Sequence, residues 1–81
     1  MDVLYFAWVR ERIGLPKENV ETSAKTVMAL VEELRGREER YAVAFSDLSA
    51  LRVAVDQDPT DFEASIEGAR EVAFFPPMTG G

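Results

Sequence analysis

The stretch TVMALVEELRG, residues 26–36, decides the fold because it is the clearest helix in the sequence. Apolar side chains recur along it at helical spacing, which predicts one buried stripe. The stripe consists of Val27, Leu30, Val31 and Leu34. Thr26 stands where a hydroxyl group caps a helix N-terminus, and Gly36 stands where a left-handed residue ends a helix. The rest of the chain is therefore expected to supply a sheet that this stripe covers.

On both sides of this helix, short apolar and β-branched runs predict strands. The predicted strands cover residues 3–7, 18–22, 51–55 and 71–75. The first two are expected to form a wide hairpin. Residues 8–13 indicate a helical turn that ends at Gly14. Residues 37–45 indicate a second short helical turn, with a strand as the alternative, and residues 56–59 indicate a turn. Strands on both sides of one amphipathic helix predict an α+β fold with a sheet packed on that helix.

The length and charge of the chain limit the number of domains and the kinds of partner that it can have. Eighty-one residues are expected to form one domain. Nine basic and 15 acidic residues give a net charge of −6, which argues against a nucleic-acid partner. Residues 41–81 hold seven of the acidic and two of the basic residues, so a partner of that half is expected to be basic overall. No signal peptide and no membrane-spanning run is recognised, which predicts a cytoplasmic protein without membrane contact.

The sequence contains neither cysteine nor histidine, which limits the chemistry that its side chains can perform. The usual thiolate nucleophile, the commonest general base and the usual zinc ligands are all missing. The acidic run from Asp56 to Glu67 partly matches a calcium-binding loop, but Asp61 stands where such a loop needs glycine. A predicted strand, instead of a helix, also precedes the run. We therefore predict neither a metal site nor a tightly bound cofactor.

Strand alternation indicates an exposed aromatic pair. In residues 71–75, Glu71 marks the solvent face, and Phe75 falls on that face while Phe74 falls on the other. In the first predicted strand, Asp2 likewise marks the solvent face, to which Phe6 belongs. Two exposed aromatic side chains on neighbouring strands are typical of an interface, so Phe6 and Phe75 are predicted to contact a partner.

Residues 76–81, PPMTGG, are predicted to form a flexible, extended C-terminal tail. Pro76 and Pro77 stiffen the exit from the last strand and are expected to belong to the partner interface. Gly80 lacks a Cβ atom and can enter a narrow channel that excludes a larger residue. Thr79 is expected to enter the same channel with it. Such a tail can deliver the carboxylate of Gly81 into the active site of another protein.

These residues carry a resemblance to a known family. The run Val3–Ala7, the segment Arg10–Gly14 and above all the ending Glu71–Gly81 closely resemble the small subunit of molybdopterin synthases. The resemblance covers the whole chain and implies the β-grasp, ubiquitin-like fold. Two features differ from the family pattern. The turn at residues 67–72 is one residue longer and more basic than usual, and Met78 stands where a smaller β-branched residue is common.

The resemblance implies a sulfur carrier that is not itself an enzyme. An adenylyltransferase of the ubiquitin-activating type would use ATP to adenylate Gly81, and a sulfur donor enzyme would convert the adenylate to a thiocarboxylate. With Thr79 and Gly80 threaded into the large synthase subunit, the tail would then donate sulfur to cyclic pyranopterin monophosphate, which forms the dithiolene of molybdopterin. The family also implies a heterotetramer of two small and two large subunits.

Other functions remain open at this point. A sulfur carrier for thiamine synthesis shares the fold and the terminal glycines, but usually lacks the approach seen at Phe74–Pro77. A ubiquitin-like protein modifier would instead join its tail to lysine side chains of target proteins. A plain interaction module with a chance Gly80-Gly81 ending would lose nothing when the tail is trimmed.

Overall fold

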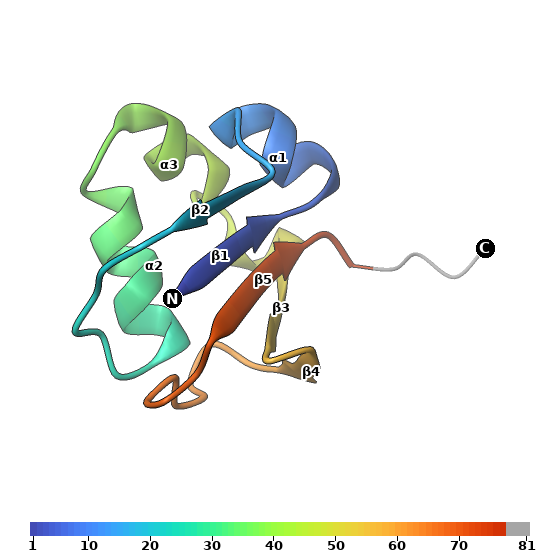
Figure 1. The fold of residues 1–81 in the computed structure, drawn as a ribbon. Helices are drawn as coiled ribbons and strands as arrows, with labels where there is room; N and C mark the ends of the chain where they lie inside the picture. Colours follow the sequence, from blue (N-terminus) through green and yellow to red (C-terminus); the bar gives the residue numbers. More distant parts are fainter. Residues whose placement is uncertain (78–81) are drawn as a thin grey trace.

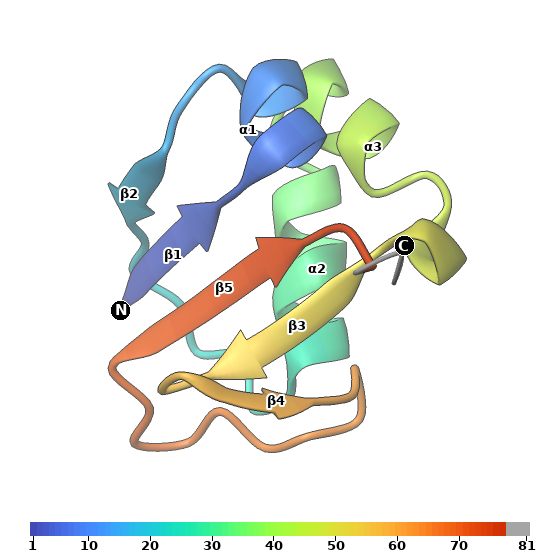
Figure 2. The ribbon, with the colours of Figure 1, turned by 90° about the vertical axis from the view of Figure 1, so that its right-hand side faces the viewer.

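The computed structural model describes residues 1–77, and a five-stranded mixed sheet lies at its centre (Figure 2). The strands are β1 (Asp2–Tyr5), β2 (Lys17–Asn19), β3 (Arg52–Val55), β4 (Asp58–Thr60) and β5 (Glu71–Phe75). Their order across the sheet is β2-β1-β5-β3-β4. The central strands β1 and β5 run parallel, whereas all other neighbours are antiparallel. Residues 78–81, which include the predicted tail positions Thr79, Gly80 and Gly81, lie outside the described residues.

Helices cover one face of this sheet. They are α1 (Ala7–Ile13), α2 (Val27–Arg35), α3 (Glu39–Ala44) and the short 3-10 helix η1 (Leu48–Ala50). In Figure 2, α2 runs behind the strands, and α1 and α3 lie at the end of the sheet where β1 stops. The predicted α+β class is confirmed, and the arrangement is the β-grasp fold that the resemblance implied. Among the described residues, no helix has the length and apolar character needed to cross a membrane.

The helix α2 agrees with its sequence pattern except at its C-terminus. The whole predicted stripe is buried, and the Thr26 hydroxyl accepts a hydrogen bond from the Ala29 N–H at 3.1 Å. The left-handed ending predicted at Gly36 is wrong, because Gly36 has a right-handed φ of −82°. The Gly36 N–H donates to the Glu33 carbonyl at 3.2 Å and the Arg37 N–H donates to the Leu34 carbonyl at 3.0 Å, so a tightened last turn ends the helix without a left-handed residue.

The first half of the sheet is shorter than predicted. The strand expected at residues 3–7 ends at Tyr5, because Ala7, with a φ of +52°, turns the chain into α1. The strand expected at residues 18–22 is Lys17–Asn19 instead, although it pairs with β1 as predicted. At Val20 the chain turns inward: the Val20 N–H donates to the Met1 carbonyl at 2.8 Å and the side chain is buried.

The second half contains one more strand than predicted. The helical turn predicted within residues 37–45 is confirmed as the helix α3. The turn expected at residues 56–59 comprises only Asp56 and Gln57, and Asp58–Thr60 pair with β3 as the edge strand β4. Pro59 tolerates this place because a sheet edge leaves half of the N–H positions without a partner strand. The last strand, β5, has the predicted bounds.

The core lies between the inner face of the sheet and the helices. Phe74 stacks on Tyr5 with ring centroids 6.3 Å apart and meets Phe45 edge-on at 5.0 Å. The fully buried large side chains all fall between Val3 and Phe74 in the sequence. The packing of the sheet on the helices is therefore complete before the chain reaches Pro76.

Candidate functional site

The candidate site is the end of the sheet at which β5 stops and the tail begins. Phe75, the last residue of β5, is paired with Arg52 of β3. Pro76 and Pro77 follow, and because proline has no N–H they cannot continue a central ladder. Figure 1 shows the chain leaving the sheet at this point. The strand thus fixes both the place and the direction in which the C-terminal residues start.

The alternation predicted for β5 is confirmed on its inner face and corrected on its outer face. Val72 and Phe74 are fully buried, as predicted. The prediction that Phe75 is exposed is wrong, because Phe75 is only half-exposed. It lines a hollow of about 350 Å³ together with Arg52, Pro59 and Pro77.

Phe6 is exposed, as predicted, although it does not belong to a strand. The residue has 47% of its surface exposed and stands at the N-cap of α1. The Phe6 N–H donates to the Phe74 carbonyl at 3.1 Å, so the backbone continues the β1–β5 ladder by one bond. Since Tyr5 is paired with Phe74, Phe6 and Phe75 emerge at the same end of two neighbouring strands. Pro76 and Pro77 are half-exposed at this end.

The outer face of the sheet, which no helix of residues 1–77 covers, extends this apolar surface. Cross-strand pairing places five apolar residues on it: Leu4, Ala54, Pro59, Ala73 and Phe75. Ala54 and Ala73 are each only 7% exposed, because their small side chains lie below their neighbours. Sequence reasoning missed Pro59 and Arg52 as parts of this site. Both residues reach this site because β3 pairs with β4 and β5. Alternation within a single strand does not reveal such pairing.

Charged groups at the β2 edge of the outer face neutralise one another. The Lys17 ammonium lies 3.6 Å from the Asp2 carboxylate. The Asn19 amide donates to Asp2 at 3.1 Å, and this hydrogen bond, together with the nearby Lys17, lowers the pKa of Asp2. The β2 edge therefore offers a partner little unbalanced charge.

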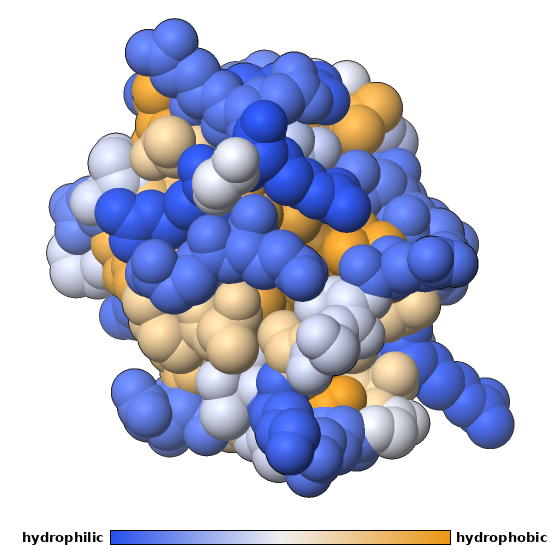
Figure 3. All heavy atoms as spheres, turned by 90° about the vertical axis from the view of Figure 1, so that its left-hand side faces the viewer, coloured by the Kyte–Doolittle hydropathy of each residue, from blue (hydrophilic) through white to orange (hydrophobic). Residues whose placement is uncertain are grey.

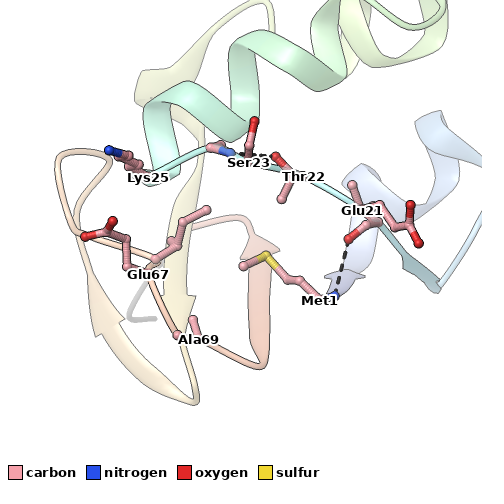
Figure 4. A pocket seen from close by; sticks show the side chains of 11 residues that line it. Met1, Glu21, Thr22, Ser23, Lys25, Glu67 and Ala69 are labelled. Carbon is pink, nitrogen blue, oxygen red and sulfur yellow. Dashed lines mark hydrogen bonds between the residues drawn. The ribbon is translucent and has the colours of Figure 1, made fainter.

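A second hollow, of about 530 Å³, lies at the opposite end of the sheet (Figure 4). Its walls come from the connection between β2 and α2, which includes Ser23 and Lys25, and from the turn before β5, which includes Glu67. The Met1 ammonium borders it and donates to the Val20 carbonyl at 3.3 Å. Because β5 runs away from this end, the hollow is separate from the tail exit.

The side of the molecule that Figure 3 shows is mainly polar. Figure 3 shows hydrophilic residues over much of the side on which α2 and α3 lie, with smaller hydrophobic areas between them. In the acidic run, the Asp56 carboxylate accepts the N–H groups of Arg70 and Glu71 at 2.9 and 3.0 Å. Asp61 accepts the Glu63 N–H at 2.9 Å. These carboxylates shape turns, and within residues 1–77 no group of three or more metal-ligating side chains gathers.

Comparison with known protein sequences points to one family. A model of the ThiS family matches residues 3–81. The molybdopterin synthase sulfur carrier subunit of Escherichia coli is 40% identical over 79 residues, which cover 98% of this chain and 96% of that protein. The subunit of the same name from Haemophilus influenzae is 36% identical and covers 100% of this chain and 99% of its own length.

Solved structures show the same fold. The crystal structure of SAMP1 from Haloferax volcanii has a TM-score of 0.76 at 23% identity, over 100% of this chain and 98% of that one. A putative molybdopterin converting factor, subunit 1, from Pyrococcus furiosus has a TM-score of 0.70 at 24% identity, over 95% of each chain. With the sequence matches over nearly its full length, the chain belongs to the ThiS family and, within it, to the molybdopterin synthase sulfur carrier subunits.

Proposed function

We propose that this chain is the sulfur carrier subunit of a molybdopterin synthase and that the carboxylate of Gly81 carries the sulfur. The observation that carries the proposal is the identity of 40% and 36%, over nearly the full length, to two subunits with that name. The end of β5 supports it, because the two prolines after Phe75 direct the chain off the sheet.

The chemistry explains why such a chain needs no reactive side chain of its own. A terminal carboxylate, with an ordinary pKa of about 3.3–3.7, is ionised and a poor electrophile at neutral pH. Adenylation with ATP turns it into an acyl adenylate and releases pyrophosphate. A sulfur donor then displaces AMP and leaves a thiocarboxylate, whose sulfur is a soft nucleophile like a cysteine thiolate. That sulfur is passed to cyclic pyranopterin monophosphate.

Each of these steps requires a partner protein. The word subunit in the names of the relatives implies a large synthase subunit, and we propose that two small and two large subunits assemble. The large subunit would supply the acid, base and cationic groups. An adenylyltransferase of the ubiquitin-activating type would bind and use the ATP, and a separate enzyme would donate sulfur. On this proposal the chain holds no cofactor, and the cytoplasmic location stays a prediction.

The outer face supports docking near the tail. Phe6 is exposed, and Phe75 and Pro77 border an apolar hollow beside the tail exit. A partner that covers this surface while it accepts the tail would bury aromatic and aliphatic groups, which commonly provide most of the affinity of an interface. Pro76 and Pro77 then hold the tail in an extended direction, so less conformational entropy is lost on binding.

Intact-protein mass spectrometry tests the proposal. The chain is incubated with ATP, the activating enzyme and a sulfur source, and a second sample omits ATP. We expect a mass increase equal to the exchange of one oxygen for sulfur, in the complete sample only and on the C-terminal fragment. Adding the large subunit and cyclic pyranopterin monophosphate should then restore the original mass. A chain that stays unmodified, or that forms adducts with lysines of other proteins, would contradict the proposal.

A further inference from the structure

Arg52 occupies a special place at the tail exit. It lies at the start of β3, on the outer face, directly opposite Phe75. Its side chain borders the 350 Å³ hollow that Phe75, Pro59 and Pro77 also line. It borders as well an adjoining hollow of about 390 Å³, which Phe62 lines. A protein that takes up the tail and covers Phe75 therefore also meets Arg52.

The guanidinium group of Arg52 is held in position by the backbone. Its Nη1 atom donates to the Leu51 carbonyl at 2.9 Å and to the Ser49 carbonyl at 3.4 Å. Nη2 and Nε have no protein partner among residues 1–77, and the residue is exposed. The Nε–Nη2 edge of a guanidinium group binds both oxygens of a carboxylate. Because the group is already positioned, little side-chain entropy is lost when a carboxylate binds this edge.

Arg52 is the one charged residue among those that line the 350 Å³ hollow in the described part of the chain, and Asp61 lines the adjoining hollow. Residues 41–81 hold seven acidic and two basic residues, and Arg52 is the basic residue at the tail exit. In the described residues Arg52 forms no ion pair, whereas Lys17, the cation at the other edge of the outer face, is paired with Asp2. The expectation of a basic partner therefore stays a prediction for the half as a whole, whereas Arg52 itself calls for an acidic group.

We infer that Arg52 is a specificity-determining residue of the tail-exit surface, and that it pairs with a carboxylate on the large synthase subunit. The matching surface has an apolar centre for Phe75 and Pro59 and an aspartate or glutamate at its rim. This inference rests on the proposed function, which supplies the partner. It adds the chemistry of the contact. The apolar residues provide buried surface area. The ion pair of Arg52 with the carboxylate fixes the orientation of the two proteins and discriminates between partners.

Calorimetric binding to the large subunit tests the inference, with the unmodified chain at low and at high salt. We expect Arg52→Gln to raise Kd about tenfold at low salt and to lose most of the salt dependence shown by the wild type. Arg52→Lys keeps the charge without the bidentate edge, so its Kd should lie between the two. Arg52→Glu should bind more weakly than Arg52→Gln, because it places like charges together.

Arg70→Gln is the matched control, because Arg70 is the other basic residue of this half and is exposed at the start of β5. Its Kd should stay within about twofold of the Kd of the wild type.

The inference is overturned if Arg52→Gln binds like the wild type, if Arg70→Gln loses as much affinity as Arg52→Gln, or if the wild type does not bind. Thermal melts check that all variants fold. Failure of the proposed function is seen separately, as the absence of thiocarboxylate on the wild-type chain.

Discussion

A single carboxylate, Glu18, joins three elements at the edge of the core. Its Oε2 atom accepts hydrogen bonds from the Tyr5 hydroxyl at 2.8 Å and from the Tyr41 hydroxyl at 2.7 Å. Arg37 lies 3.6 Å from the other carboxylate oxygen. Glu18 belongs to β2, Tyr5 to β1 and Tyr41 to α3, so these bonds fasten a helix to the short edge of the sheet. The two aromatic rings are buried while both hydroxyl groups remain satisfied.

This cluster predicts a loss of stability at alkaline pH. Burial, and then the hydrogen bond to Glu18, raise the pKa of Tyr5 and of Tyr41 above their ordinary value of 10.0. Above about pH 10 the unfolded chain therefore releases these protons while the folded chain retains them, so the free energy of unfolding decreases as pH rises. Tyr5→Phe should cost about 1.5–3 kcal/mol at pH 7, because a bond to a charged acceptor is lost.

Urea titrations between pH 7 and pH 11 measure both effects. The wild type should hold its stability up to about pH 9 and lose it above about pH 10, and Tyr5→Phe should show a smaller decrease over the same range. An equal decrease in both proteins would mean that Tyr5 does not titrate as its environment predicts. Tyr41→Phe provides the second half of the test, because Tyr41 donates to the same oxygen.

Phe74 and Phe75 are adjacent residues with opposite expected roles. Phe74 is fully buried between Tyr5 and Phe45, so Phe74→Ala should cost about 3–5 kcal/mol of stability. Phe75 borders the hollow at the tail exit, so Phe75→Ala should weaken docking to the large subunit by roughly thirtyfold. Because Phe75 is half-buried, a small decrease in melting temperature is also expected.

Thermal melts and calorimetric binding separate the two variants. Binding is measured at a temperature at which Phe74→Ala remains folded. If Phe74→Ala melts like the wild type, the inner face assigned to β5 is wrong. If Phe75→Ala binds the large subunit as tightly as the wild type, the tail-exit surface does not dock.

The element that sequence reasoning missed, β4, depends on an unusual turn. Asp56 and Gln57 have φ values of +49° and +71°, so both central residues of the β3–β4 hairpin are left-handed. This is the two-residue turn that suits antiparallel strands, and Asn-Gly or Asp-Gly is its usual sequence. Here the second position is glutamine, and a proline follows two residues later. Neither this glutamine nor this proline is typical of a hairpin. The sequence of the segment therefore predicts a turn without a following strand.

The strained glutamine gives a prediction for this hairpin. Glycine adopts a positive φ without a steric cost, so Gln57→Gly should stabilise the protein by about 0.5–1 kcal/mol. Gln57→Ala is the control, because alanine retains the strain and should change little. Chemical denaturation of the three proteins measures the difference. Equal stability of Gln57→Gly and Gln57→Ala would show that the turn is not strained at this residue.

The elements predicted well are those whose signal lies within one segment. The stripe and the Thr26 cap of α2, the glycine that ends α1, and the inner face of β5 all depend on neighbours in sequence. The predictions were wrong where contacts with a distant segment of the chain determine the structure. The bounds of β2 match its pairing with β1, and Phe75 shares its hollow with Pro59 of another strand. The family resemblance implied the β-grasp fold, and local patterns do not contain the order of its strands.

At the scale of the whole molecule, the residues that stabilise the fold and those proposed to act are separated along the chain. The fully buried large side chains lie between Val3 and Phe74, and the proposed acyl group lies at Gly81. The helices cover the inner face of the sheet, whereas the outer face and the tail exit stay open to a partner. Changes to the last residue are therefore expected to alter function without altering stability.

Deletion of Gly81 tests this separation. The shortened chain ends in a carboxylate on Gly80, which moves the terminal carboxylate back by one residue, a span of at most about 3.6 Å. Because a displacement of about 1 Å can lower a rate a hundredfold, the rates of adenylation and sulfur transfer should decrease at least a hundredfold.

A C-terminal tag should abolish both steps, since it occupies the carboxylate of Gly81 in a peptide bond. The same tag at the N-terminus is the matched control and should leave activity unchanged. Melting temperatures of the C-terminal variants should equal that of the wild type, and a C-terminally tagged chain that still transfers sulfur in a reconstituted synthase would disprove the role of Gly81.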